Sequence, residues 1–182
     1  MSGRCWLYAD PHFFHEGVCK FLRKDGSKLR PWDNADVMSE YMINEYNKLV
    51  HPQDRVYILG DVAMTRKALD RSLPRLVGRK VLVKGNHDED KLSYYSQYFD
   101  DIRAYVIKKN FILSHIPIHP GSMGRWAINI HGHLHYNRVE AIGRSPCAGH
   151  GEAYDPRYVC VSVEHTDYKP ILLDTILKQN LK

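Results

Sequence analysis

Residues 80–88 read Lys-Val-Leu-Val-Lys-Gly-Asn-His-Asp, a short apolar run followed directly by polar side chains. The valines and leucine favour an extended strand, and Gly85 marks the point where that strand ends. Asn86 then offers a neutral carbonyl oxygen, while His87 and Asp88 offer an imidazole and a carboxylate. The stretch therefore predicts a sheet strand whose carboxyl end carries chemically useful groups.

The same arrangement occurs four more times along the chain. The segments are Asp10-Pro11-His12, Gly60-Asp61, Ser114-His115 and His131-Gly132-His133-Leu134-His135. The strand-like runs that precede or lead into them are 5–9, 55–59, 110–114 and 126–130. Ligand sites in α/β sheets favour the carboxyl edge of the strands, so we expect the five segments to meet there.

The elements between these segments predict an α/β fold. Helical patterns cover 15–24, a stretch from Asp33 or Asn34 to His51-Pro52, 66–77 with a break at Pro74, and 89–98. The apolar face of the second helix is expected to comprise Val37, Met38, Tyr41, Met42, Tyr46 and Leu49. The second half is richer in strands (102–108, 110–114, 126–130, 157–163, and a last strand or helix from Pro170), with a long loop over 136–156. We expect a sandwich of sheets flanked by helices, more antiparallel in its second half.

Bulk composition indicates an ordinary globular protein. The chain has 182 residues, 43% of them hydrophobic and 26% charged, which favours one domain over residues 1–182. No run approaches the ~20 apolar residues of a membrane span, and Met1–Cys5 lacks the apolar stretch of a signal peptide. Four cysteines without a CxxC pair favour free thiols and a cytoplasmic location. A net charge of +5 fits a nucleotide or nucleic-acid substrate, and equally an ordinary basic protein.

Ligand types point to divalent cations. Asp10 and His12 alternate along the chain and can face the same side, and so can His133 and His135. A carboxylate with an imidazole suits Mn²⁺, Fe²⁺, Zn²⁺ or Ni²⁺ better than Mg²⁺ or Ca²⁺. Alone, each motif is weak, because Asp and Gly-Asp also serve turns. Together the motifs supply enough donors for two ions about 3.5–4 Å apart, a pair that clamps the attacking and leaving oxygens at phosphorus.

In the order of its motifs the chain resembles the calcineurin-like metallophosphoesterase superfamily. That family runs Asp-x-His, Gly-Asp, Gly-Asn-His-Asp/Glu, a single His, then Gly-His-x-His. Here the matching segments span residues 10–135, and the start Asp10-Pro11-His12-Phe13-Phe14-His15 is most similar to small phage and bacterial members. The resemblance implies a four-layer α/β/β/α sandwich of two mixed sheets flanked by helices.

Residue roles follow from this resemblance. It implies that the first metal is held by Asp10, His12, Asp61 and His135, and the second by Asp61, Asn86, His115 and His133, so that Asp61 bridges them. A hydroxide shared by the two ions would be the nucleophile, and His87 would be the catalytic residue that protonates the leaving oxygen. Mn²⁺ is the favoured ion, with Fe, Zn, Ni or Co as alternatives. His15, Asp88 and His131 are candidates for substrate contact or for support of the ligands.

Several functions remain open at this stage. A metal-dependent phosphodiesterase acting on a nucleotide or nucleic-acid type substrate is favoured, because an acid such as His87 helps poor leaving groups most. A phosphomonoesterase is the alternative within enzymes, and a non-catalytic metal-binding scaffold of the same fold is the alternative outside them. No membrane partner is expected. The natural substrate, native metal, oligomeric state and pathway are not specified by the sequence.

Overall fold

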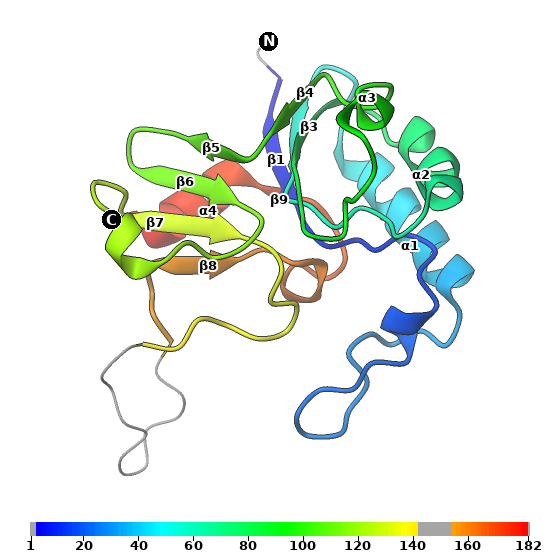
Figure 1. The fold of residues 1–182 in the computed structure, drawn as a ribbon, viewed down its shortest axis with the longest axis horizontal. Helices are drawn as coiled ribbons and strands as arrows, with labels where there is room; N and C mark the ends of the chain where they lie inside the picture. Colours follow the sequence, from blue (N-terminus) through cyan, green and yellow to red (C-terminus); the bar gives the residue numbers. More distant parts are fainter. Residues whose placement is uncertain (1–2, 142–153, 182) are drawn as a thin grey trace.

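The computed structural model describes residues 3–141 and 154–181, which form two β-sheets flanked by helices (Figure 1). The first sheet has the order β4-β3-β2-β1-β9 and the second the order β5-β6-β7-β8. The first comprises β1 (Cys5–Tyr8), β2 (Arg55–Ile58), β3 (Arg79–Val83), β4 (Asp101–Arg103) and β9 (Ile171–Leu172). The second comprises β5 (Tyr105–Ile107), β6 (Phe111–Ser114), β7 (Ile128–His131) and β8 (Tyr158–Cys160).

Both sheets are mixed, which confirms the α/β fold of two mixed sheets flanked by helices. Strands β1 to β4 run parallel and β9 pairs antiparallel with β1. In the second sheet β6, β7 and β8 run parallel and β5 is antiparallel to β6. The second half is more antiparallel than the first, as expected, because strands β5 and β9 form the antiparallel pairs, although β6, β7 and β8 are parallel to one another. The connections after β6 and β7 are long enough to return the chain to the same end of the sheet, which a parallel pair requires.

Alternation along the strands of the first sheet divides the core in two. Trp6 and Tyr8 pack into one apolar cluster with the helices, whereas Leu7 and Ala9 pack into another with Phe111, Leu113 and Ile130 of the second sheet. Because successive strand side chains point to opposite faces, one strand serves both cores. This two-sided burial explains why 5–9 reads as a continuous apolar run.

Four helices accompany the sheets. They are α1 (Ala35–Leu49), α2 (Arg66–Ser72), α3 (Leu92–Tyr95) and α4 (Leu173–Asn180). Asn34 caps α1, since its side-chain oxygen accepts a hydrogen bond from the Val37 backbone N–H at 3.0 Å. Within the described residues, no helix has the length and apolar character needed to cross a membrane.

The buried face of α1 differs from the expected one. Met38, Met42 and Tyr46 are fully buried, as predicted, but Val37 is 58% exposed and Tyr41 is 37% exposed. Ile43, not included in the expected face, is buried in their place. The buried face of α1 is therefore rotated about the helix axis relative to the face predicted from the apolar residues.

Other helices are shorter than expected. Residues 15–24 contain only the 3-10 turn η1 (Gly17–Cys19), and 89–98 contain only α3. The helix over 66–77 is interrupted at Pro74, as predicted: α2 is followed by the 3-10 turn η2 (Leu73–Arg75), because Pro74 has no N–H to donate to a continuing α-helix. Two further 3-10 turns are η3 (Pro120–Ser122) and η4 (Val163–His165). Most of the expected loop 136–156, including Cys147, lies outside the described residues.

Asp54 ties the start of β1 to the start of β2. Its carboxylate accepts hydrogen bonds from the Arg4 backbone at 2.7 Å, the Trp6 indole at 2.9 Å and the His51 backbone at 3.0 Å.

We expect Asp54→Ala to lower the free energy of unfolding by about 2–4 kcal/mol, because buried donors lose their partner. Urea unfolding measures this. As control, Asp33→Ala removes an exposed carboxylate and should cost less than about 1 kcal/mol; an equal loss in both variants would contradict the assignment.

Candidate metal centre

The polar segments meet at one edge of the molecule, as the sequence predicted. In the first sheet, Asp10, Asp61 and Asn86 follow the carboxyl ends of β1, β2 and β3. In the second sheet, His115 follows β6, and His133 and His135 follow β7. Each sheet therefore contributes donors to a common region between the strand ends.

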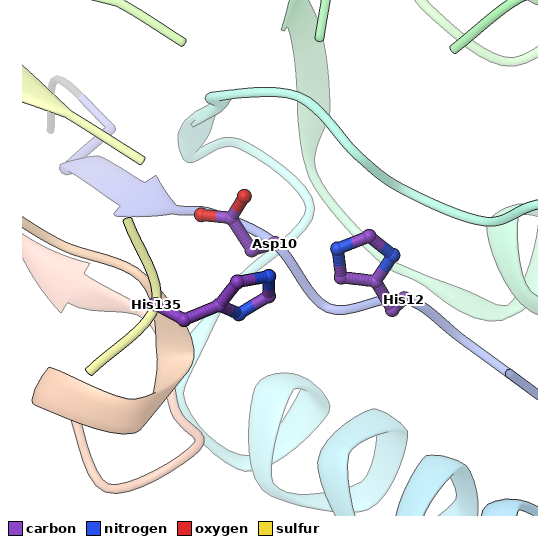
Figure 2. Close-up of side chains that lie close together, drawn as sticks. All are labelled: Asp10, His12 and His135. Atoms are coloured by element: carbon purple, nitrogen blue, oxygen red, sulfur yellow. The ribbon is translucent and has the colours of Figure 1, made fainter. Parts of the chain in front are cut away.

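Two clusters of three donors form in this region. The first comprises Asp10, His12 and His135, with one ligand atom from each lying within 4.8 Å of the others (Figure 2). Figure 2 shows Asp10 and His12 on the loop that follows β1, and His135 reaching them from a separate segment. The second cluster comprises Asp61, His115 and His133 at the same spacing. Each cluster combines side chains from both sheets.

Asp61 lies between the two clusters. Its Oδ2 is 3.4 Å from His115 Nε2 and 3.7 Å from His12 Nε2. Asn86 joins the second cluster, because its Oδ1 lies 2.8 Å from His115 Nε2. The two groups of ligands are therefore neighbours, with one carboxylate oxygen facing an imidazole of each.

Asp10 connects the two sheets. Its carboxylate oxygens each accept the His133 backbone N–H at 3.0 Å, and Oδ2 also accepts the Ser162 hydroxyl at 2.7 Å. Complete burial raises the pKa of this carboxyl to about 6, despite the opposing effect of nearby His115 and His135. A buried carboxylate of this kind is stabilised by nearby positive charge.

Asp61 and His115 form a complementary pair. Burial alone would raise the pKa of Asp61, but the hydrogen bond and charge of His115 hold it at about 2. Burial would also lower the pKa of His115, yet Asp61 and Asp10 raise it to about 8. The region thus concentrates negative charge that a cation can balance.

His12 supplies a test of whether this donor set fits a metal. Its side chain is 5% exposed, and neither ring nitrogen has a hydrogen-bond partner among the described residues. Burial, followed by the charge of Arg30, lowers the pKa of His12 well below its usual value. A buried, neutral imidazole without a partner is costly unless it binds something. The position beside Asp10 and Asp61 fits a divalent ion.

The backbone at the clusters is held in the left-handed region. Positive φ angles occur at Asp10 (55°), His12 (46°), Asp61 (52°), His133 (68°) and His135 (50°). Left-handed conformations in non-glycine residues cost of order 1–3 kcal/mol each and gather at functional sites. The strain here coincides with the metal-ligand candidates.

Glycines of the motifs leave room for the carboxylates. A Cβ on Gly85 would lie 2.3 Å from Asp61 Oδ1, and one on Gly132 would lie 2.4 Å from Asp10 Oδ2. Both distances are far below van der Waals contact, so only glycine fits without displacing a candidate ligand. Gly85 and Gly132 thus have two roles: they follow the end of a strand, and they leave space for the carboxylates of Asp61 and Asp10.

Asp88 supports the loops from behind. Its side chain is fully buried and accepts backbone N–H groups of Asp61 at 2.9 Å, Val62 at 3.0 Å and Gly85 at 2.8 Å. Because Asp88 is fully buried, its side chain has no surface with which to contact a substrate. Asp88 instead fixes the loops that carry Asp61 and Asn86.

The remaining histidines occupy different positions. His87 is exposed, and its ring centroid lies 5.9 Å from that of His12. The ring centroid of His15 also lies 5.9 Å from that of His12, and His15 is half-buried. His131 is fully buried, packs edge-on against Tyr158 and does not belong to either cluster of described donors. Burial lowers the pKa of His131 to about 4, so His131 is a neutral core residue beside the ligands.

Three buried residues near the clusters were missed from the sequence: Arg30, Ser162 and Glu164. Ser162 and Glu164 follow β8 at the same edge as the other segments, so the strand-end rule could have identified them. Arg30 comes from an irregular loop, and no pattern around it signals burial.

Comparisons with known proteins support the fold. No protein-family model matches the chain. It is 29% identical to an uncharacterised protein, MJ1445, of Methanocaldococcus jannaschii over 180 residues, which cover 96% of this chain and 90% of that protein. The crystal structure of AQ665 from Aquifex aeolicus, a protein of unknown function, superposes with a TM-score of 0.67 at 27% identity, covering 97% of this chain and 99% of that one. A nuclease of Pseudomonas putida, MPE, gives a TM-score of 0.46 at 21% identity over 76% of this chain and 64% of that one.

Gly85→Ala tests the close packing of Asp61. We expect Mn²⁺ affinity to fall about 10- to 100-fold, because the added methyl group displaces a carboxylate. Isothermal titration calorimetry measures this. Gly26→Ala is the matched control, since Gly26 has a φ of +82° but a methyl group added there would meet nothing within 4 Å. It should lose about 1 kcal/mol of stability and no ion affinity. Wild-type affinity in Gly85→Ala would show that Asp61 does not bind the ion.

Proposed function

We propose that this chain is a dinuclear metal-dependent phosphoesterase of the calcineurin-like type that hydrolyses phosphodiesters. The observation that carries the proposal is the pair of adjacent donor clusters with Asp61 between them, 3.7 Å from His12 and 3.4 Å from His115. A carboxylate in this position could bind two ions at once. A site for a single structural ion does not need such a shared carboxylate. Ligand sets without cysteine also differ from those of most structural zinc sites.

Mixed carboxylate and imidazole donors favour Mn²⁺, with Fe, Zn, Ni or Co as alternatives. In this proposal Asp10, His12 and His135 would hold one ion, Asn86, His115 and His133 would hold the other, and Asp61 would contribute to both. Bound divalent ions lower the pKa of water and balance negative charge on a phosphoryl group. The chain's own contribution is to fix the donors in place and to exclude other partners from them.

His87 is the proposed acid. It is exposed beside the first cluster, and its backbone N–H donates to Asp61 Oδ1 at 2.9 Å, which fixes its position relative to the ligands. It also lines a cavity of about 300 Å³ together with Met64, Thr65 and Glu89. A leaving group seated there could receive a proton from the imidazole.

A diester is the favoured substrate class. An exposed acid contributes most when the leaving alcohol is a poor leaving group, as in nucleotides and nucleic acids. The net charge of +5 favours the approach of such anions. Phosphomonoester hydrolysis is the second candidate, because the donor clusters alone do not distinguish the two. A cytoplasmic location and a single domain over residues 1–182 stay predictions.

Metal-dependent turnover tests the proposal directly. Protein stripped with a chelator and then given Mn²⁺ should hydrolyse bis-p-nitrophenyl phosphate faster than p-nitrophenyl phosphate. The reason is that two bound ions would supply activated water, and the cavity beside His87 has room for a second ester group. A preference for the monoester would move the second candidate to first place. Bound Mn²⁺ without turnover of either ester would support the non-catalytic scaffold.

Loss of His87 separates chemistry from binding. We expect His87→Ala to lower kcat for the diester about 10²- to 10⁴-fold, because no acid remains to protonate the leaving oxygen. Mn²⁺ affinity should stay at the wild-type value. His51→Ala is the control, since His51 is exposed and precedes β2 at the end opposite Asp61. Unchanged kcat in His87→Ala would remove the proposed role of this residue.

A further inference from the structure

Arg30 is a fully buried cation behind the first cluster. Its guanidinium donates through Nη2 to the Asp10 carbonyl at 2.6 Å and through Nη1 to the Pro11 carbonyl at 2.8 Å. These two carbonyls belong to the loop that carries Asp10 and His12, where the backbone is left-handed. The guanidinium therefore holds that loop in its strained conformation.

Glu164 connects Arg30 to the third donor of the cluster. The side chains of Arg30 and Glu164 are both 0% exposed, and Arg30 Nε donates to Glu164 Oε1 at 2.8 Å. The same oxygen lies 3.0 Å from His135 Nδ1. One carboxylate oxygen thus links the loop after β1 to the loop after β7.

This contact determines which nitrogen of His135 is available. When Nδ1 carries the proton and donates to Glu164, the lone pair of the neutral ring lies on Nε2. A carboxylate behind a ligating histidine fixes its tautomer and ring orientation in many metal sites. Nε2 is then the nitrogen that His135 presents to an ion beside Asp10 and His12.

Charge gives Glu164 a second role. An unpaired cation in this position would repel a divalent ion. The Glu164 carboxylate, whose Oε1 accepts from Arg30 Nε at 2.8 Å, balances the charge of the guanidinium. The pair is neutral as a unit, and the loop is fixed without an excess positive charge.

The second cluster is positioned by other groups. His115 Nδ1 lies 2.8 Å from the Leu59 carbonyl, and the Asp61 carboxylate accepts the His87 backbone N–H. In the described part of the chain, neither Arg30 nor Glu164 makes a hydrogen bond with a member of this cluster. Arg30 and Glu164 therefore contact the first cluster directly and are connected to the second only through Asp10, which accepts the His133 backbone N–H.

We propose that Arg30 and Glu164 are positioning residues that set the metal affinity of the Asp10–His12–His135 cluster and leave that of the Asp61–His115–His133 cluster unchanged. This inference rests on the proposed function, because it requires two ions in the wild-type protein. It adds two residues, absent from the motifs, to the machinery of the site.

Glu164→Gln is the decisive variant. It keeps the shape of the side chain, removes the charge and leaves Arg30 unbalanced. In Mn²⁺ titration calorimetry we expect two binding steps for the wild type. The variant should retain one step unchanged and weaken the other about 10- to 100-fold. Electron paramagnetic resonance at limiting Mn²⁺ provides a second measurement. The wild type should give the spectrum of two coupled ions, and Glu164→Gln should give that of an isolated Mn²⁺.

The tautomer of His135 gives a readout that a merely structural role would not change. Long-range ¹H–¹⁵N NMR of metal-free protein at alkaline pH should show the proton on Nδ1 in the wild type. In Glu164→Gln the proton should be distributed over both nitrogens. Glu164→Asp keeps the charge and should recover part of the affinity. It also serves as the second variant if Glu164→Gln does not fold. Glu40→Gln, which removes an exposed charge on α1, is the matched control.

The outcomes separate the two proposals. A wild-type protein that binds fewer than two Mn²⁺ ions overturns the proposed function and this inference with it. Two ions in the wild type and unchanged binding in Glu164→Gln overturn only the inference. Equal weakening of both steps, with an unchanged His135 tautomer, would also overturn it, because the pair would then act only through general stability.

Discussion

The buried carboxylate of Asp10 is the point at which the two sheets are joined. It follows β1 of the first sheet, accepts the His133 backbone from the loop after β7, and accepts the Ser162 hydroxyl after β8. The Asp10 backbone N–H donates to the Gly60 carbonyl at 3.1 Å, which brings in the loop after β2. Four strand ends therefore converge on one residue. Every other feature of the site depends on this convergence, because both donor clusters need side chains from each sheet.

Holding the donors in place costs free energy of folding, and contacts around the site offset this cost. The left-handed backbone at five candidate ligands is unfavourable, and burial of several carboxylates and imidazoles adds to it. Three groups compensate. Asp88 accepts three backbone N–H groups, Arg30 donates to two backbone carbonyls, and Glu164 balances Arg30 and contacts His135. Polar residues that carry no chemistry thus determine the geometry of those that do.

The sequence predicted the parts of this molecule that depend on local pattern. Apolar runs located the strands, and the polar residues directly after them located the edge where Asp10, Asp61 and His115 meet. Helix extents were less accurate, because residues near 15–24 and 89–98 have helical spacing but receive too little packing to continue beyond a short turn. The strand directions of the second sheet depend on long connections, which leave no local signal. Arg30 was invisible for a similar reason, since its burial arises from contacts with residues far along the chain.

The distribution of donors over two sheets also affects the order in which the molecule is made. Residues up to β4 supply Asp10, His12 and Asp61, but the first cluster lacks His135 and the second lacks His115 and His133. The last donor for either ion, His135 for the first and His133 for the second, is added only when the loop after β7 has left the ribosome. The second sheet must then have packed against the first. Chains that are still being synthesised should therefore lack the proposed phosphoesterase activity, because that activity requires the complete fold.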